Sequence, residues 1–132
     1  MIVVDTNIIG FLFLTGDQSA LAEQALLKDA QWAAPLLWRS EMRNVLAHYI
    51  RNDTLSVEDA QEIMKAAVDL MQGQEFAVTS NQVLELVSVS TCSAYNCEFV
   101  ALAQDLKVPL VKLVVRAHLS DLSHPVFLRL LR

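Results

Sequence analysis

This sequence has few glycines: three among 132 residues, at positions 10, 16 and 73. Gly-rich loops bind phosphate through backbone amides, and they need patterns such as G-x-G-x-x-G or G-x-x-x-x-G-K-[ST]. Three glycines at this spacing form neither pattern, so both of these nucleotide-binding loops are excluded. The nucleophile elbow of serine hydrolases, G-x-S-x-G, is absent as well.

Cysteine is also scarce, with two residues, Cys92 and Cys97. On a helix, five residues turn through about 500°, so the two thiols would point about 140° apart. We interpret them as separate structural thiols rather than as a disulfide or a metal-binding pair. The three histidines show no spacing typical of zinc ligands, which argues against a zinc site.

Long apolar runs are missing too, although 54% of the residues are hydrophobic. No charge-free run reaches the 18 or so residues of a transmembrane helix. Asp5 interrupts the first apolar run and no basic segment precedes it, so we expect no signal peptide and a cytoplasmic protein. The high apolar share and the 19% charged share exclude disorder and predict one domain over residues 1–132. The apolar excess further predicts a homodimer, in which an interface buries it.

The formal net charge is -5, from 10 basic and 15 acidic residues. Such a chain has no overall attraction for nucleic acid, so any contact with RNA would need a local basic patch. Basic residues do occur in groups, Arg39 and Arg43 around Glu41, and Lys112 with Arg116. They are either solvated surface charges or a rim that contacts phosphates. The excess of carboxylates suits a hard cation such as Mg²⁺.

The hydrophobic pattern predicts strands that alternate with helices. We expect strands at 2–4, 31–34, 76–78, 109–111 and 126–130. We expect helices at 8–14, 18–28, between Pro35 and Asn52, from 57 to near Gly73, at 80–89 and at 94–106. This alternation predicts an α/β fold of three layers (α/β/α) with a four- or five-stranded parallel sheet. Trp32, Trp38 and Tyr49 are expected to be core or interface anchors rather than base-stacking platforms.

Two acids are candidates for chemistry. Asp5 follows the strand at 2–4, and in parallel sheets sites form beyond the carboxyl ends of the strands. Such an acid is either a helix N-cap or a site ligand. Glu41 lies early in a helix beside its buried face, where an acid taken alone is more often solvated. Haloacid-dehalogenase phosphatases also begin with a strand that ends in Asp, but they need a second Asp where this chain has Asn7.

Two segments carry a family resemblance. Residues 1–9 read M-I-V-V-D-T-N-I-I, and residues 93–103 read S-A-Y-N-C-E-F-V-A-L-A, followed by V-P-L-V at 108–111. In this order, over nearly the full chain, they resemble the PIN-domain family and within it the VapC-type toxins of bacterial toxin–antitoxin pairs. The resemblance implies a PIN-like fold and an endoribonuclease that uses Mg²⁺ or Mn²⁺ held by about four acids. It also implies an antitoxin-like protein partner, bound along a hydrophobic groove.

Carried over by position, the resemblance makes Asp5, Glu41 and Asn96 the metal-binding and catalytic residues. The family usually has Asp where this chain has Asn96. The fourth acid belongs to a P-L-V-T-x-D stretch, which reads P-L-V-K-L-V here, so that Lys112 and Val114 replace the Thr and the Asp. The predicted substrate-binding residues are Thr6, Asn7, Arg39, Arg43, Lys112 and Arg116.

Losing two of four acids weakens metal binding and catalysis, because an amide brings no charge and cannot act as a base. Asp121 could replace a missing ligand through a loop, whereas Glu98 is about 200° from Asn96 around the helix and is expected to face away. Two hypotheses remain. The chain is either a weakened endoribonuclease, or a catalytically inactive PIN module that dimerises and binds a partner protein or RNA.

Overall fold

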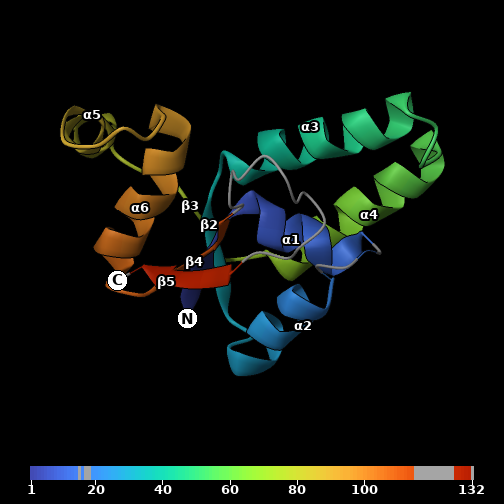
Figure 1. Ribbon diagram of the computed structural model, residues 1–132, viewed down its shortest axis with the longest axis horizontal. Helices are drawn as coiled ribbons and strands as arrows, with labels where there is room; N and C mark the ends of the chain where they lie inside the picture. The colour runs from blue at the N-terminus through green and yellow to red at the C-terminus, as the bar shows by residue number, and fades with distance from the viewer. Residues whose placement is uncertain (15, 17–18, 115–126, 132) are drawn as a thin grey trace.

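The computed structural model describes residues 1–14, 16, 19–114 and 127–131 (Figure 1). The strands are β1 (Ile2–Val4), β2 (Trp32–Pro35), β3 (Glu75–Phe76), β4 (Leu110–Val114) and β5 (Phe127–Leu131). The helices are α1 (Thr6–Phe13), α2 (Ser19–Lys28), α3 (Trp38–Arg51), α4 (Val57–Leu70), α5 (Ser80–Ser88) and α6 (Ala94–Leu106). Each predicted element is present, with ends shifted by a few residues.

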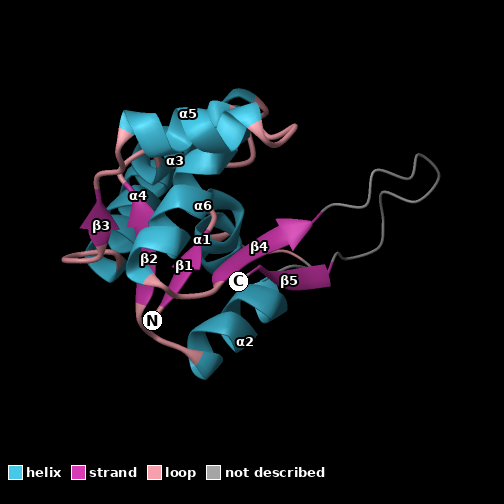
Figure 2. Ribbon diagram, turned by 90° about the vertical axis from the view of Figure 1, so that its left-hand side faces the viewer, coloured by secondary structure: helices cyan, strands magenta, loops and turns pink. Residues whose placement is uncertain are grey.

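The five strands form one sheet in the order β3-β2-β1-β4-β5 (Figure 2). The first four strands of this order are parallel, as the alternation of strands and helices predicts. β5 runs antiparallel to β4, with Leu110 opposite Leu131 and Val114 opposite Phe127. The fifth strand therefore exists, but a fully parallel five-stranded sheet is wrong. A parallel partner for β4 needs a crossover connection, whereas an antiparallel partner only needs the chain to turn back.

Helices cover both faces of the sheet, which confirms the three-layer α/β/α architecture. On one face α6 packs on β1 and β2, and α5 packs on α6. On the other face α1 packs on β4 and also contacts α2 and α3, while α4 packs on α3. Figure 1 shows α5 and α6 on one side of the strands, and α1, α3 and α4 on the other.

The core lies between these layers. All three residues of β1 are buried, because a central strand has neighbours on both faces. Trp32 and Trp38 are among the largest fully buried side chains, and Tyr49 packs against the core, which confirms their prediction as anchors. Cys92 is exposed and Cys97 is buried, both as free thiols. In the part of the chain that the structure describes, no helix is long and apolar enough to cross a membrane.

Candidate functional site

Asp5 stands where β1 ends and α1 begins. Its Oδ1 atom accepts a hydrogen bond from the backbone N–H of Ile8 at 3.1 Å, so the carboxylate caps α1. Its own N–H donates to the carbonyl of Val111 in β4 at 3.2 Å, which fixes this junction to the neighbouring strand. The same residue lines a cavity at this edge of the sheet. The N-cap and the site wall are thus two roles of one side chain.

Thr6 joins α1 to α3. Its hydroxyl donates to Oε1 of Glu41 at 2.8 Å, and Thr6 is only 5% exposed. A buried hydroxyl that donates to a carboxylate restricts the rotamers of that carboxylate. The sequence predicts Thr6 to contact substrate, and the structure places its hydroxyl against Glu41. This contact joins residues 35 positions apart, so no local pattern signals it.

The cavity has a volume of about 360 Å³. It brings together Asp5, Glu41 and Asn96, which come from α1, α3 and α6, each from the start of its helix. The partial positive charge of a helix N-terminus stabilises anions, and here it favours the ionised carboxylates of Asp5 and Glu41. The remaining lining residues are Thr6, Asn7, Leu37, Ser40, Asn44, Val45, Tyr95 and Phe99.

A second cavity of about 400 Å³ lies at the other end of α6 and β4. Lys107 is the one titratable side chain among its lining residues in the described part of the chain. Polar chemistry therefore favours the cavity that holds Asp5 and Glu41, although it is slightly smaller.

The donor set suits a hard cation. Asp5 and Glu41 offer carboxylate oxygens and Asn96 offers an amide oxygen, and Mg²⁺ is held in proteins by one or two carboxylates with several waters. Among the described residues, no group of three or more His, Cys, Asp or Glu side chains is placed to hold a metal ion. A third oxygen ligand in this cavity would have to come from an uncharged group such as the amide of Asn96.

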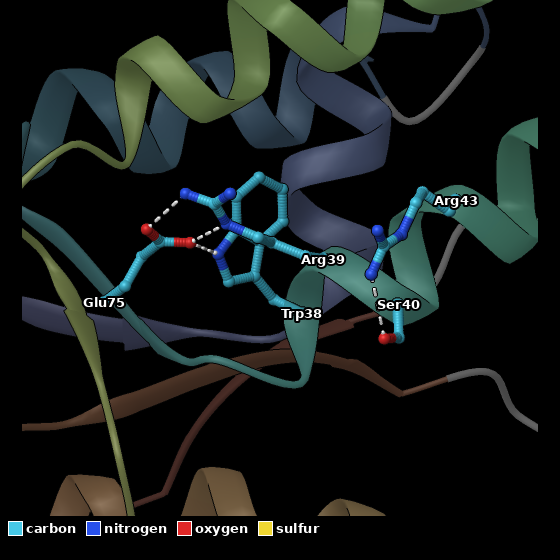
Figure 3. A network of polar contacts seen from close by, with 5 residues as sticks. All are labelled: Trp38, Arg39, Ser40, Arg43 and Glu75. Carbon is cyan, nitrogen blue, oxygen red and sulfur yellow. Dashed lines mark hydrogen bonds and ion pairs between the residues drawn. The ribbon is translucent and has the colours of Figure 1, made fainter.

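Arg39 does not reach this cavity as the described residues form it. Its Nε and Nη2 atoms donate to the two carboxylate oxygens of Glu75 at 2.6 and 2.7 Å, and Trp38 Nε1 donates to the same carboxylate at 2.7 Å (Figure 3). The guanidinium lowers the pKa of Glu75, and Glu75 raises the pKa of Arg39. These bonds fasten β3 to the start of α3.

Arg43 lies at the rim of the site. Its Nη2 atom donates to Ser40 Oγ at 3.1 Å, and Ser40 lines the cavity (Figure 3). Lys112 lies in β4, directly after Val111, whose carbonyl accepts from Asp5. Arg116 and Asp121 fall outside the described residues. Among the described residues of the predicted basic rim, Arg43 is the one whose side chain bonds to a residue that lines the cavity.

Glu98 is not among the described residues that line the cavity of Asp5, Glu41 and Asn96, and it lines a neighbouring cavity instead. Burial raises its pKa first, and the negative charge of Glu41 raises it further. The two carboxylates therefore lie within electrostatic range of each other.

Tyr95 is the residue that the sequence analysis missed. Its side chain is 64% exposed and lines the cavity beside Asn96. It also lines a third cavity of about 310 Å³, together with Val78, Ser80, Val83, Leu84, Ala94 and Glu98. Tyr95 directly precedes Asn96 in the segment 93–103 that carries the family resemblance, and this position could have identified it as a site residue.

No protein-family model matches this sequence, and no curated protein matches it. Among solved structures, the chain is similar to a chain of the toxin-antitoxin complex from Klebsiella pneumoniae. The two share a TM-score of 0.63 and 17% sequence identity, over 92% of this chain and 93% of that chain. At this identity the likeness shows a common fold, and it extends over almost the whole of both chains.

Proposed function

We propose that this chain is the toxin of a toxin–antitoxin pair, a PIN-type endoribonuclease that uses Mg²⁺ or Mn²⁺ and is weakened by Asn96. The observation that carries this proposal is the convergence of Asp5, Glu41 and Asn96 on one cavity at three helix N-termini. The fold shared with a chain of a toxin-antitoxin complex supports the biological role.

The chemistry follows from what each side chain can do. Asp5, Glu41 and Asn96 would hold a Mg²⁺ or Mn²⁺ ion, which supplies an activated water and offsets charge on the phosphate. Glu41, oriented by Thr6, can accept a proton from a water molecule that attacks RNA. Asn96 supplies an oxygen but neither charge nor basicity, so turnover is reduced. Arg43 at the rim contacts a flanking phosphate.

The direct test measures cleavage of single-stranded RNA by the purified chain with Mg²⁺ or Mn²⁺. We expect slow cleavage that Glu41→Gln reduces by about 100-fold or more, as for loss of a positioned base. We expect Asn96→Asp to increase both the rate and the calorimetric affinity for Mn²⁺. Glu62→Gln on exposed α4 is the matched control and keeps the rate of the unmodified chain. Cleavage that survives Glu41→Gln comes from a contaminating nuclease and refutes the assignment.

The second candidate is a catalytically inactive PIN module, and Asn96 is the observation that favours it. Under this alternative neither the unmodified chain nor Asn96→Asp cleaves RNA, while a partner protein still binds. For either candidate we propose a homodimer and an antitoxin-like protein partner. Light scattering at micromolar concentration tests the dimer, with a mass of twice 14.7 kDa expected. A small neighbouring open reading frame with a DNA-binding N-terminus would supply the partner.

A further inference from the structure

The cavity next to the catalytic site carries a separate inference. It lies between α5 and the first turn of α6, and Tyr95 lines both this cavity and the catalytic one. The two cavities therefore adjoin at Tyr95. We call this neighbouring space the α5–α6 pocket. It is formed by Val78, Ser80, Val83, Leu84, Ala94, Tyr95 and Glu98.

The walls of the α5–α6 pocket are apolar and aromatic. Leu84 and Tyr95 are 62% and 64% exposed, so these two large apolar side chains present contact area to solvent. Each base of a single-stranded RNA has a flat face that stacks on such a ring, whatever its sequence. The volume of about 310 Å³ is at the lower end of the range for small-ligand sites and is large enough for one base.

The charge of the pocket selects the base rather than the backbone of RNA. Among the described residues that line it, Glu98 is the one charged side chain. A carboxylate repels a phosphate, whereas the edge of a base is neutral. A carboxylate accepts hydrogen bonds from exocyclic amino groups, as Glu and Asp do from N4 of cytosine. Uracil has no amino group to donate.

We propose that the α5–α6 pocket is a nucleobase subsite that takes one unstacked, amino-bearing base of single-stranded RNA next to the catalytic cavity. Tyr95 stacks on the base, and Glu98 accepts from its amino group. The inference rests on the proposed function, because it names the substrate that the catalytic cavity shares. Proteins that read single-stranded RNA combine these two elements, an aromatic platform and hydrogen bonds to the edge of the base.

The test measures binding, apart from cleavage, by fluorescence anisotropy of labelled RNA hexamers of A, C or U with Ca²⁺ present. We expect the A and C hexamers to bind more tightly than the U hexamer. Tyr95→Ala weakens binding by about 5- to 150-fold, the range for loss of one base–aromatic stack, and Tyr95→Phe retains it. Glu98→Gln lowers the preference for C over U by about tenfold. Leu27→Ala, at an 87% exposed position on α2, is the matched control and leaves binding unchanged.

Two outcomes would overturn the subsite: no binding of any hexamer, or equal binding by the unmodified chain and Tyr95→Ala. If cleavage depends on Glu41 but neither its KM nor hexamer binding depends on Tyr95, the subsite is wrong and the nuclease assignment stands. If no cleavage occurs but binding depends on Tyr95 and Glu98, the subsite stands and the nuclease assignment fails. Loss of hexamer binding when a protein partner covers Tyr95 supports the subsite, because the two then share a surface.

Discussion

The cavity that holds Asp5, Glu41 and Asn96 has two walls of different construction. The α3 wall, formed by Glu41 of α3 with Thr6 of α1 against it, is tied to the core: Thr6 is buried and donates to Glu41, and Trp38, three residues before Glu41 in α3, is buried as well. The α6 wall, which we define as Tyr95 and Asn96 in the first turn of α6, is exposed. The Asn96 N–H donates to Ser93 Oγ at 3.1 Å, and this hydrogen bond caps the helix. Under the proposed function, the buried wall would position the groups that act on RNA and the exposed wall would contact the RNA.

The largest expected effect separates the two walls by stability. Trp38→Ala removes a fully buried ring and its hydrogen bond to Glu75, so it lowers the free energy of unfolding by about 3–5 kcal/mol. Tyr95→Ala, at an exposed aromatic position, changes it by about 0.5 kcal/mol or less. Urea denaturation of both variants measures this contrast. Similar losses in the two would show that the α6 wall is as integral to the fold as the α3 wall.

The next effect concerns activity within the α3 wall. Thr6→Val keeps the shape of the side chain but removes the donor to Glu41, so Glu41 is no longer held in one orientation. We expect RNA cleavage to fall by about 10- to 100-fold, as when the hydrogen-bond partner of a metal ligand is lost. Thr6→Ser retains the hydroxyl and serves as the control. Unchanged cleavage by Thr6→Val would mean that Glu41 needs no positioning.

Helix caps allow a matched comparison between the α6 wall and a distant helix. Ser93 caps α6 and Ser56 caps α4, with N–H to Oγ distances of 3.1 and 3.0 Å. Either Ser→Ala change costs about 1 kcal/mol of unfolding free energy. Ser93→Ala also frees the first turn that carries Tyr95 and Asn96, so we expect it alone to weaken RNA binding. Equal binding by both variants would contradict the role of the α6 wall in recognition.

The smallest effect is the pH dependence of the clamp behind the α3 wall. Arg39 lowers the pKa of Glu75, so the ionised clamp stabilises the fold above the ordinary pKa of a glutamic acid, about 4.3. This contribution is lost as the pH falls from there toward the lowered pKa. Glu75→Gln should therefore flatten the decline of the unfolding midpoint between about pH 5 and 3. Asp29, whose pKa is lowered by the N-terminal amine, still contributes a residual slope.

Local sequence patterns predicted the features that are determined by residues close together in the chain, namely the helices and strands. The β-branched run at residues 2–4 with Asp5 after it specified β1, its burial and the place of the site. The partners of Arg39 and Glu41 could not be predicted from local patterns. Glu75 lies 36 residues from Arg39, and Thr6 lies 35 residues from Glu41, so each pair forms only in the folded chain. Arg39 was therefore assigned to the rim, although the structure pairs it with Glu75.

The direction of β5 and the environment of Glu98 illustrate the same limit. A hydrophobic run indicates that a strand forms. Whether that strand is parallel or antiparallel to its neighbour depends on the connection between the two strands in the folded protein. A helical angle shows the side from which Glu98 leaves α6, but its distance from Glu41 depends on how α3 and α6 stand across the sheet. Both quantities belong to the tertiary arrangement.

The Arg39–Glu75 pair also bears on how the edge of the sheet resists aggregation. The rim of a β-sheet offers unpaired amides and carbonyls that can template addition of a foreign strand and lead to aggregation. At the β3 end of the sheet this rim is two residues long, and one of the two carries a carboxylate bound to a guanidinium. A short, charged rim is a poor template for such growth. Neutralising Glu75 therefore does more than loosen a helix, because it leaves that end of the sheet more open to fibrillar stacking.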